Sequence, residues 1–336
     1  MTLLDEASAP AAQDAPRVLD AGLPRGDRIF HAWARTIGFT VLAVFGSIGL
    51  FLGYQSIPTL RRYGFSFFTE SQWQPQLDKL GIASVMIGTV EVAIVAMVVA
   101  FPLSIATALY ISEYAPLRFR SMLISAIDLM AAIPSIVYGL WGFFLLQPQI
   151  IGVSRWLHQN LGFLPLFKVD TDPHAAAYQQ SSYTASAFIA GIVVSMMAIP
   201  LACAVMRGVF SQAPLGEREA AYALGATRWG MVRAVVLPFG KGGIIGGTML
   251  ALGRSLGETI AVLLIISPAF EIKVNVLEVG TITTASLIAG LFGEATSSQL
   301  SALLAAGFVL FLLTLIVNTI AALFVSRSRS GAMTDA

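Results

Sequence analysis

Glu219-Ala220-Ala221-Tyr222-Ala223-Leu224-Gly225 lies between two long apolar segments. A second run, Val235-Val236-Leu237-Pro238, follows it before the second of these segments. Helix-forming residues precede Gly225, a residue that permits a turn, and Pro238 ends the apolar stretch that follows. We therefore predict a short helix, a turn at Gly225 and a second helix over Thr227–Leu237. Because the segment has no membrane-spanning character of its own, it is expected on one face of a membrane protein.

The composition of the chain supports a membrane location. Hydrophobic residues make up 56% of the 336 residues and charged residues only 12%, which is far more apolar than a soluble domain. A spanning helix needs about 20 apolar residues. We predict an all-α polytopic membrane protein whose six transmembrane helices are Trp33–Ile57, Gly81–Ile111, Phe119–Gln147, Thr184–Arg207, Gly242–Ala269 and Leu300–Val325.

The distribution of Lys and Arg predicts the orientation of these helices. With both termini inside, 13 of the 20 Lys and Arg residues fall on the inner side, six fall outside, and Arg254 lies within a span. The positive-inside rule therefore favours an N-in, C-in arrangement, which places the Glu219 segment in the cytoplasm.

Four regions follow from this arrangement. Residues 1–28 are expected to be a disordered cytoplasmic arm, because the first 24 are rich in Ala, Pro and Asp and poor in aromatic residues. Residues 29–80 hold the first transmembrane helix and an extracytoplasmic loop. The membrane core is predicted at 81–325 and includes the cytoplasmic segment 208–240, and a cytoplasmic tail follows at 326–336.

Several function classes are excluded by missing patterns. The chain contains no G-x-x-x-x-G-K-[ST] and no H-E-x-x-H, and no basic cluster for nucleic acid. In the long predicted loop 148–183, Asp170, Asp172 and His174 are better interpreted as solvated loop residues than as metal ligands. We expect no catalytic residue, no metal and no cofactor bound by this chain, so any nucleotide hydrolysis must come from another chain.

Four ionisable residues lie within the predicted spans: Glu91, Asp128, Arg254 and Glu258. Each costs at least about 2.5 kcal/mol in hydrocarbon, so each is expected to face a partner or a water-filled path. Glu258 follows Arg254 by four residues, which places it one helical turn further on the same face and within reach of an ion pair.

Two interpretations of Arg254 and Glu258 compete. The two side chains either neutralise each other and fix helix packing, or Arg254 lines the route of an anion while Glu258 holds the guanidinium in place. The second is favoured, since intramembrane charges mark pathways and the planar fork of Arg suits a tetrahedral oxyanion.

The other two intramembrane acids are less informative. Asp128 precedes a Pro134 step that loosens its helix, and it pairs either with Arg254 or with Arg120; the sequence does not separate these. Glu91 receives no role.

Glycines recur along the fifth predicted span. Gly242, Gly246, Gly253 and Gly257 fall on one helical strip, and small residues at this spacing let another helix approach closely. We predict a helix-packing contact along this strip, beside the charged pair.

Three segments together resemble one family, the phosphate-specific ABC importer permeases: Asp128–Gly142 with its Ala-Ala-Ile-Pro-Ser-Ile-Val-Tyr-Gly core, the Glu219–Pro238 segment, and Gly253–Thr259. The resemblance extends from about residue 26 to 325. The apolar continuation Thr259–Val262, the entry Gly26–Phe30 and the loop ending Trp73–Pro75 are similar to those of the PstC-type subunits of this family.

The resemblance implies half of a type I importer in a bacterial cell membrane. Its expected partners are a PstA-like permease, a PstB-like ATPase dimer that uses ATP and Mg²⁺, a PstS-like extracytoplasmic phosphate-binding protein, inorganic phosphate and membrane lipid. Phosphate passage is implied for Arg254, Glu258 and Asp128. Docking to the ATPase is implied for Glu219, Ala220, Ala221 and Gly225.

Three other functions remain open from the residues alone. Arg254 would serve sulfate or molybdate as well as phosphate. An ATP-independent anion channel or carrier would need no docking segment. A structural membrane scaffold would leave Arg254 and Glu258 as a packing pair only.

Overall fold

The computed structural model describes residues 25–169 and 181–328. The predicted arm up to residue 24, the acidic cluster of the 148–183 loop and the last eight residues of the tail lie outside the described residues. The chain divides into two units, one ending at Ile48 and one beginning at Gly49.

The first unit contributes the beginning of α1 (Arg25–Tyr63). This helix is longer than the predicted Trp33–Ile57, and residues 25–28, which we predicted to be disordered, form its first turn. The second unit begins inside α1, where the ring of Phe311 would lie 2.9 Å from a Cβ at Gly49. In the same unit Thr59 donates a hydrogen bond to Ser301, at 2.8 Å. Small and hydroxyl side chains thus let the end of α1 pack against the last helix.

A small hairpin follows α1, and it joins the apolar cluster that holds this end of the second unit. It consists of α2 (Ser66–Thr69), β1 (Trp73–Gln74), η1 (Pro75–Leu77) and β2 (Lys79–Leu80), with the two strands antiparallel. Phe67, Trp73 and Leu80 are buried in this cluster. We call this region the hairpin end.

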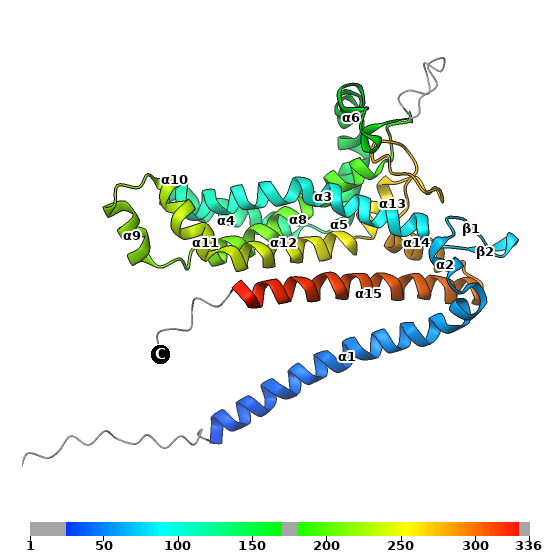
Figure 1. The fold of residues 1–336 in the computed structure, drawn as a ribbon, viewed down its shortest axis with the longest axis horizontal. Helices are drawn as coiled ribbons and strands as arrows, with labels where there is room; N and C mark the ends of the chain where they lie inside the picture. The colour runs from blue at the N-terminus through cyan, green and yellow to red at the C-terminus, as the bar shows by residue number, and fades with distance from the viewer. Residues whose placement is uncertain (1–24, 170–180, 329–336) are drawn as a thin grey trace, which may run out of the picture. The chain divides into compact units, whose positions relative to one another are not determined.

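Three helices pack side by side as the centre of the second unit (Figure 1). They are α3 (Ala83–Leu109), which the π-helical turn η2 (Tyr110–Tyr114) extends, α8 (Ala187–Phe210) and α12 (Lys241–Leu256). Small residues bring the backbones close: a Cβ at Gly191 would lie 2.5 Å from Val95, and one at Gly247 would lie 2.9 Å from the carbonyl of Ala202. Such contacts drive helix association where the surroundings are as apolar as the helices.

The third predicted span is displaced along the chain. Helix α4 (Leu117–Ala132) ends at Ile133, which is extended as expected before Pro134. A new helical run then passes through α5 (Ser135–Trp141), the π-helical η3 (Gly142–Leu146) and α6 (Gln147–Leu161), and η4 (Pro165–Phe167) follows. The candidate span is therefore Ser135–Leu161 rather than Phe119–Gln147, and residues 148–161 of the predicted loop are helical.

The fifth predicted span is broken. Helix α12 ends at Leu256, and α13 (Ile260–Ile265) begins after the non-helical residues 257–259. The chain then runs irregularly to α14 (Thr284–Leu291), which begins with a capping box at Thr283, and ends in α15 (Ser297–Ser328). Helix α15 lies beside α12.

The segment between α8 and α12 is helical in pieces. It contains α9 (Leu215–Ala223), α10 (Arg228–Met231), the π-helical η5 (Val232–Val236) and α11 (Leu237–Phe239). We call residues 211–240 the docking segment and its side of the second unit the docking end.

Five of the described helical runs are long and apolar enough to cross a membrane, and a sixth follows if Arg228–Phe239 and Lys241–Leu256, bent by 69°, form one broken span. The predicted all-helical membrane architecture is confirmed.

Candidate functional site

The docking segment has the predicted helix–turn–helix geometry. Gly225 has φ of +82°, a left-handed conformation that disfavours residues with a Cβ. The amide of Ala226 donates to the carbonyl of Ala221 at 3.0 Å, and that of Gly225 donates to Tyr222 at 2.9 Å. These two bonds form a Schellman motif, which satisfies the last carbonyls of α9. Thr227 then caps α10 by accepting from the amide of Gly230.

The predicted docking residues do not all face outward. Glu219, Ala220 and Gly225 are exposed, whereas Ala221 is half-buried and packs against the apolar cluster around Met206 and Phe210. Ala221 therefore has a packing role within this chain. Five large apolar side chains that we did not single out from the sequence are exposed on the same segment, and Leu224 is 89% exposed. They are Leu215, Tyr222, Leu224, Trp229 and Phe239. Their outward position was not predictable from apolarity alone.

Two contacts that the sequence did not indicate attach the docking segment to the end of α3. Arg218 of α9 lies 3.2 Å from the carboxylate of Glu113 in η2 and donates a second hydrogen bond to the carbonyl of Phe210 at 2.6 Å. The guanidinium of Arg228 lies 5.5 Å from the centroid of the Tyr114 ring, within the range of a cation–π interaction.

Arg254 lines a pocket of about 550 Å³ formed by α8, α12 and α15 and by the break after α12. Its lining residues are Leu201, Met249, Leu250, Gly253, Arg254, Gly257, Glu258, Thr314 and Asn318. Arg254 itself is exposed in this chain. Among the described residues no carboxylate lies within ion-pair distance of its guanidinium. A cation that lines a pocket without a partner leaves its hydrogen-bond donors available to an anion.

The expected pairing of Arg254 with Glu258 on one helical face is wrong. Helix α12 ends at Leu256, so Glu258 lies in the break and not one turn further along the same helix. Glu258 is 8% exposed, and one oxygen accepts a hydrogen bond from the amide of Ala261 at 3.4 Å. Its carboxylate thus faces the first turn of α13, where amides without helical partners favour negative charge. Both residues still line the same pocket.

Asp128 has neither of the two partners that we considered. Its nearest cation is Arg207 of α8, at 3.9 Å, and the Asp128 side chain is 57% exposed. Asp128 lies on α4, which is not one of the candidate spans, and it does not line the Arg254 pocket. Because the chain breaks at Ile133–Pro134, Asp128 lies on α4 and not on the candidate span that follows.

The glycine strip of α12 makes few contacts inside this chain. A Cβ at Gly246 would meet nothing within 4 Å, and one at Gly253 would lie 3.5 Å from Asn318. The close approach to α8 occurs at Gly243 and Gly247 instead. The predicted packing of a second helix along Gly242, Gly246, Gly253 and Gly257 therefore stays a prediction.

Glu91 is buried in α3, and its Oε1 has no hydrogen-bond partner among the described residues. No group of three or more His, Cys, Asp or Glu residues in the described ranges is arranged to hold a metal ion.

Comparisons with known proteins identify the family of the chain. Residues 100–330 match the family described as binding-protein-dependent transport system inner membrane component. The chain is 39% identical over 301 residues to phosphate transport system permease protein PstC 2 of Mycobacterium bovis, covering 88% of this chain and 91% of the relative. It is 37% identical over 323 residues to the PstC protein of Xylella fastidiosa, with 96% and 95% coverage.

A solved structure with a similar fold is among the matches. It is a bacterial ABC transporter involved in the import of the acidic polysaccharide alginate, with 16% sequence identity and a TM-score of 0.50 over 92% of this chain. The chain therefore belongs to the binding-protein-dependent transport system inner membrane component family, and within it to the PstC-type permeases. It is a multi-pass inner-membrane transport subunit and not an enzyme.

Proposed function

We propose that this chain is the transmembrane permease subunit of an ATP-driven, binding-protein-dependent importer of inorganic phosphate and forms half of its translocation pathway. The observation that carries the proposal is the similarity, over about nine-tenths of the chain, to proteins named as phosphate transport permeases. The exposed guanidinium of Arg254 in a pocket beside a broken helix supports an anionic substrate.

The pocket suggests how the substrate passes. Arg254 offers a charged donor fork to the oxyanion, and the break at residues 257–259 leaves backbone groups that are acceptable in a membrane only where they are buried or line a cavity. Glu258 stays within the same pocket but is bound to the start of α13, so its charge opposes long retention of an anion without neutralising Arg254 directly.

The energy source lies in another chain. As a member of its family, this subunit works in an ABC transporter complex with a partner permease and an ATPase. We propose that these are a PstA-like permease and a PstB-like ATPase dimer that binds ATP and Mg²⁺, with a PstS-like protein delivering phosphate. In this proposal the termini and the docking segment are cytoplasmic, and Glu219, Ala220 and Gly225 lie at the ATPase interface.

The test is uptake of radiolabelled phosphate at low external phosphate, in cells that lack their own high-affinity system and express the partner genes. The native chain is compared at matched membrane levels with Arg254→Gln, and with Arg62→Gln as a control for an exposed arginine outside the pocket. We expect uptake with the native chain and the control and a loss of at least tenfold with Arg254→Gln.

Other outcomes would change the proposal in defined ways. Equal uptake by the native chain and Arg254→Gln would keep phosphate import but reduce Arg254 to packing. No phosphate uptake with either, combined with uptake of labelled sulfate or molybdate, would overturn the substrate assignment.

A further inference from the structure

One buried charge contact joins the docking segment to the η2 turn at the end of α3. The side chain of Glu113 is 4% exposed and that of Arg218 is 16% exposed, and they meet at 3.2 Å. Arg218 also holds the carbonyl of Phe210 at 2.6 Å. One guanidinium therefore joins three elements: α9 of the docking segment, the end of α8 and the η2 turn that ends α3.

We propose that Arg218 and Glu113 form the joint that transmits movement of the docking segment to α3, and that they are positioning residues for transport rather than a plain stability contact. This inference rests on the proposed function only in taking the docking segment as the ATPase interface. It does not depend on which anion is carried.

The energetics of the pair favour such a role. A buried ion pair seldom stabilises a protein more than well-packed apolar residues of similar size would, because both charges lose their hydration. This pair is also incompletely satisfied: Glu113 Oε1 and Arg218 Nε are buried and have no hydrogen-bond partner among the described residues. The buried pair loses hydration and leaves one donor and one acceptor without a partner. These properties suit a contact whose geometry changes during the transport cycle.

A second contact also joins the docking segment to the end of α3. Arg228, at the start of α10, lies over the ring of Tyr114, the residue next to Glu113. The two arginines, one from α9 and one from α10, therefore contact adjacent residues of η2. A π-helical turn departs from regular α-helical bonding and is often found at functional positions, and here it is the part of α3 that the docking segment contacts.

Helix α3 connects this joint to the rest of the transport unit. It packs along α8 and contacts α12, whose last turn carries Arg254. Towards its other end α3 contacts the start of α14, where the Thr89 and Thr284 hydroxyls lie 3.0 Å apart. A displacement of η2 thus reaches both the pocket helix and the hairpin end through packed elements.

The test uses the complete transporter, reconstituted with its partner subunits. The apolar pair Arg218→Met with Glu113→Leu removes the charges but keeps the volume, and the exchanged pair Arg218→Glu with Glu113→Arg restores opposite charges. The control is Arg62→Met with Asp78→Leu, an arginine–aspartate pair whose side chains are more than half exposed. ATP hydrolysis and co-purification of the ATPase are measured for each.

A substrate-independent readout separates this inference from the proposed function. Cys203 is the one native cysteine and is buried, so a reporter at Asn318→Cys, which lines the Arg254 pocket, is labelled by a maleimide with and without ATP. In the native pair we expect ATP to change the labelling rate at least tenfold. In the apolar pair we expect ATP hydrolysis and co-purification to persist while this change is lost, with at least partial recovery in the exchanged pair.

Two results would overturn the proposal that Arg218 and Glu113 form this joint. One is an apolar pair that keeps the full ATP-dependent change in labelling. The other is an apolar pair that loses the ATPase from the complex and is not rescued by the exchanged pair, since that would make the contact a structural anchor. Failure of phosphate uptake alone, with labelling still ATP-dependent, would refute the proposed substrate and leave the joint intact.

Discussion

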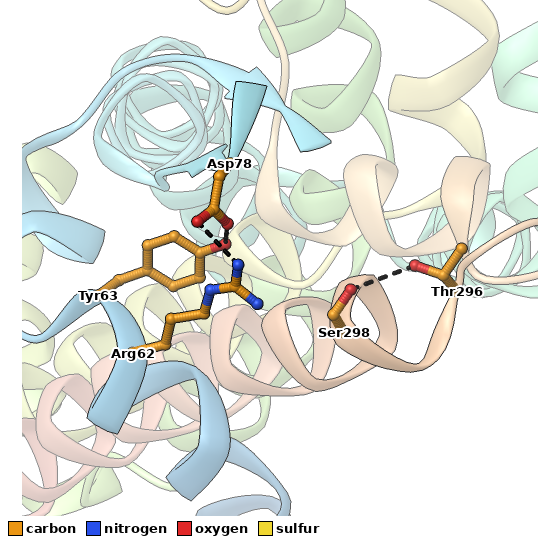
Figure 2. Close-up of polar contacts among 5 residues, drawn as sticks. All are labelled: Arg62, Tyr63, Asp78, Thr296 and Ser298. Atoms are coloured by element: carbon orange, nitrogen blue, oxygen red, sulfur yellow. Dashed lines mark hydrogen bonds and ion pairs between the residues drawn. The ribbon is translucent and has the colours of Figure 1, made fainter. Parts of the chain in front are cut away.

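The docking end and the hairpin end each contain an arginine–carboxylate pair, and the two pairs lie in opposite surroundings. At the docking end Arg218 meets Glu113 with both side chains largely buried. At the hairpin end Arg62 meets Asp78 at 2.7 Å with the two side chains 57% and 58% exposed, and the Tyr63 hydroxyl donates to the other oxygen of Asp78 (Figure 2). The exposed pair has the shorter distance, yet water screens it.

The comparison shows that distance alone does not rank ion pairs. Removing one partner from a buried pair leaves an uncompensated charge, whereas an exposed charge regains its hydration. We therefore expect the docking end to depend on charge and the hairpin end to depend on backbone packing. Four predictions test that division, beginning with the largest expected effect.

Glu113→Leu alone should lower the free energy of unfolding by about 3–5 kcal/mol, because it leaves the Arg218 guanidinium buried without its carboxylate. Unfolding of the purified chain in detergent, followed by denaturant titration, measures this loss. Asp78→Leu is the matched variant at the other end and should show a much smaller loss. Equal losses would remove the distinction between the two ends.

Gly88→Ala should destabilise the hairpin end by about 1–3 kcal/mol, since an added methyl would overlap the carbonyl oxygen of Ile282 and lie 2.9 Å from Thr281. Gly208→Ala is the control, because a Cβ there meets nothing within 4 Å and alanine is the better helix former. The same titration applies. If Gly88→Ala were as stable as the control, backbone packing would not be what holds this end.

Gly225→Leu should impair the coupling of ATP hydrolysis to phosphate uptake more than it lowers the stability of the folded chain. Its φ of +82° costs a residue with a Cβ about 1–2 kcal/mol, but the position is open, so no clash follows. We expect phosphate uptake per ATP hydrolysed to fall while the chain stays folded in the membrane. Gly225→Asn, which tolerates the left-handed region better, should retain most coupling. Normal transport by a well-expressed Gly225→Leu chain would argue against a shaped docking turn.

The smallest effect concerns pH at the hairpin end. The hydrogen bond from Tyr63, followed by that from Arg62, lowers the pKa of Asp78 below its ordinary value near 3.8. Because the pKa is lower in the folded state, the ionised carboxylate stabilises the folded state at any pH above the pKa that it has in the unfolded chain. This contribution is lost as the pH falls through the pKa of the folded state. The free energy of unfolding should therefore be larger for the native chain than for Asp78→Asn at neutral pH. A titration with pH should show this difference shrinking in acid. A difference that is constant with pH would show that the Asp78 charge contributes nothing.

Much of the architecture was predictable because it depends on local pattern. Four of the six predicted spans occur close to the expected positions, since a run of about 20 apolar residues has few alternatives in a bilayer. The turn at Gly225 was predictable for a similar reason: a glycine between a helix-forming stretch and a second apolar one favours a left-handed helix end.

The positions that sequence analysis missed depend on where helices break. We treated residues 119–147 and 242–269 as continuous spans, whereas the chain breaks at Ile133–Pro134 and at residues 257–259. Proline predicted a loosened helix at the first site but not a new span reaching Leu161. At the second site Gly257 ends α12, so the spacing of Arg254 and Glu258 did not translate into a shared helical face.

By itself the sequence determined the class of the protein: an all-helical membrane permease with a turn at Gly225 and a cation at Arg254, because composition and short motifs act over a few residues. Only the tertiary structure decided which charges meet. Arg218 and Glu113 are 105 positions apart, and Asp128 lies beside Arg207 rather than Arg120 or Arg254. Such pairings follow from how α3, α4, α8 and α9 pack, and no periodicity within one segment carries that information.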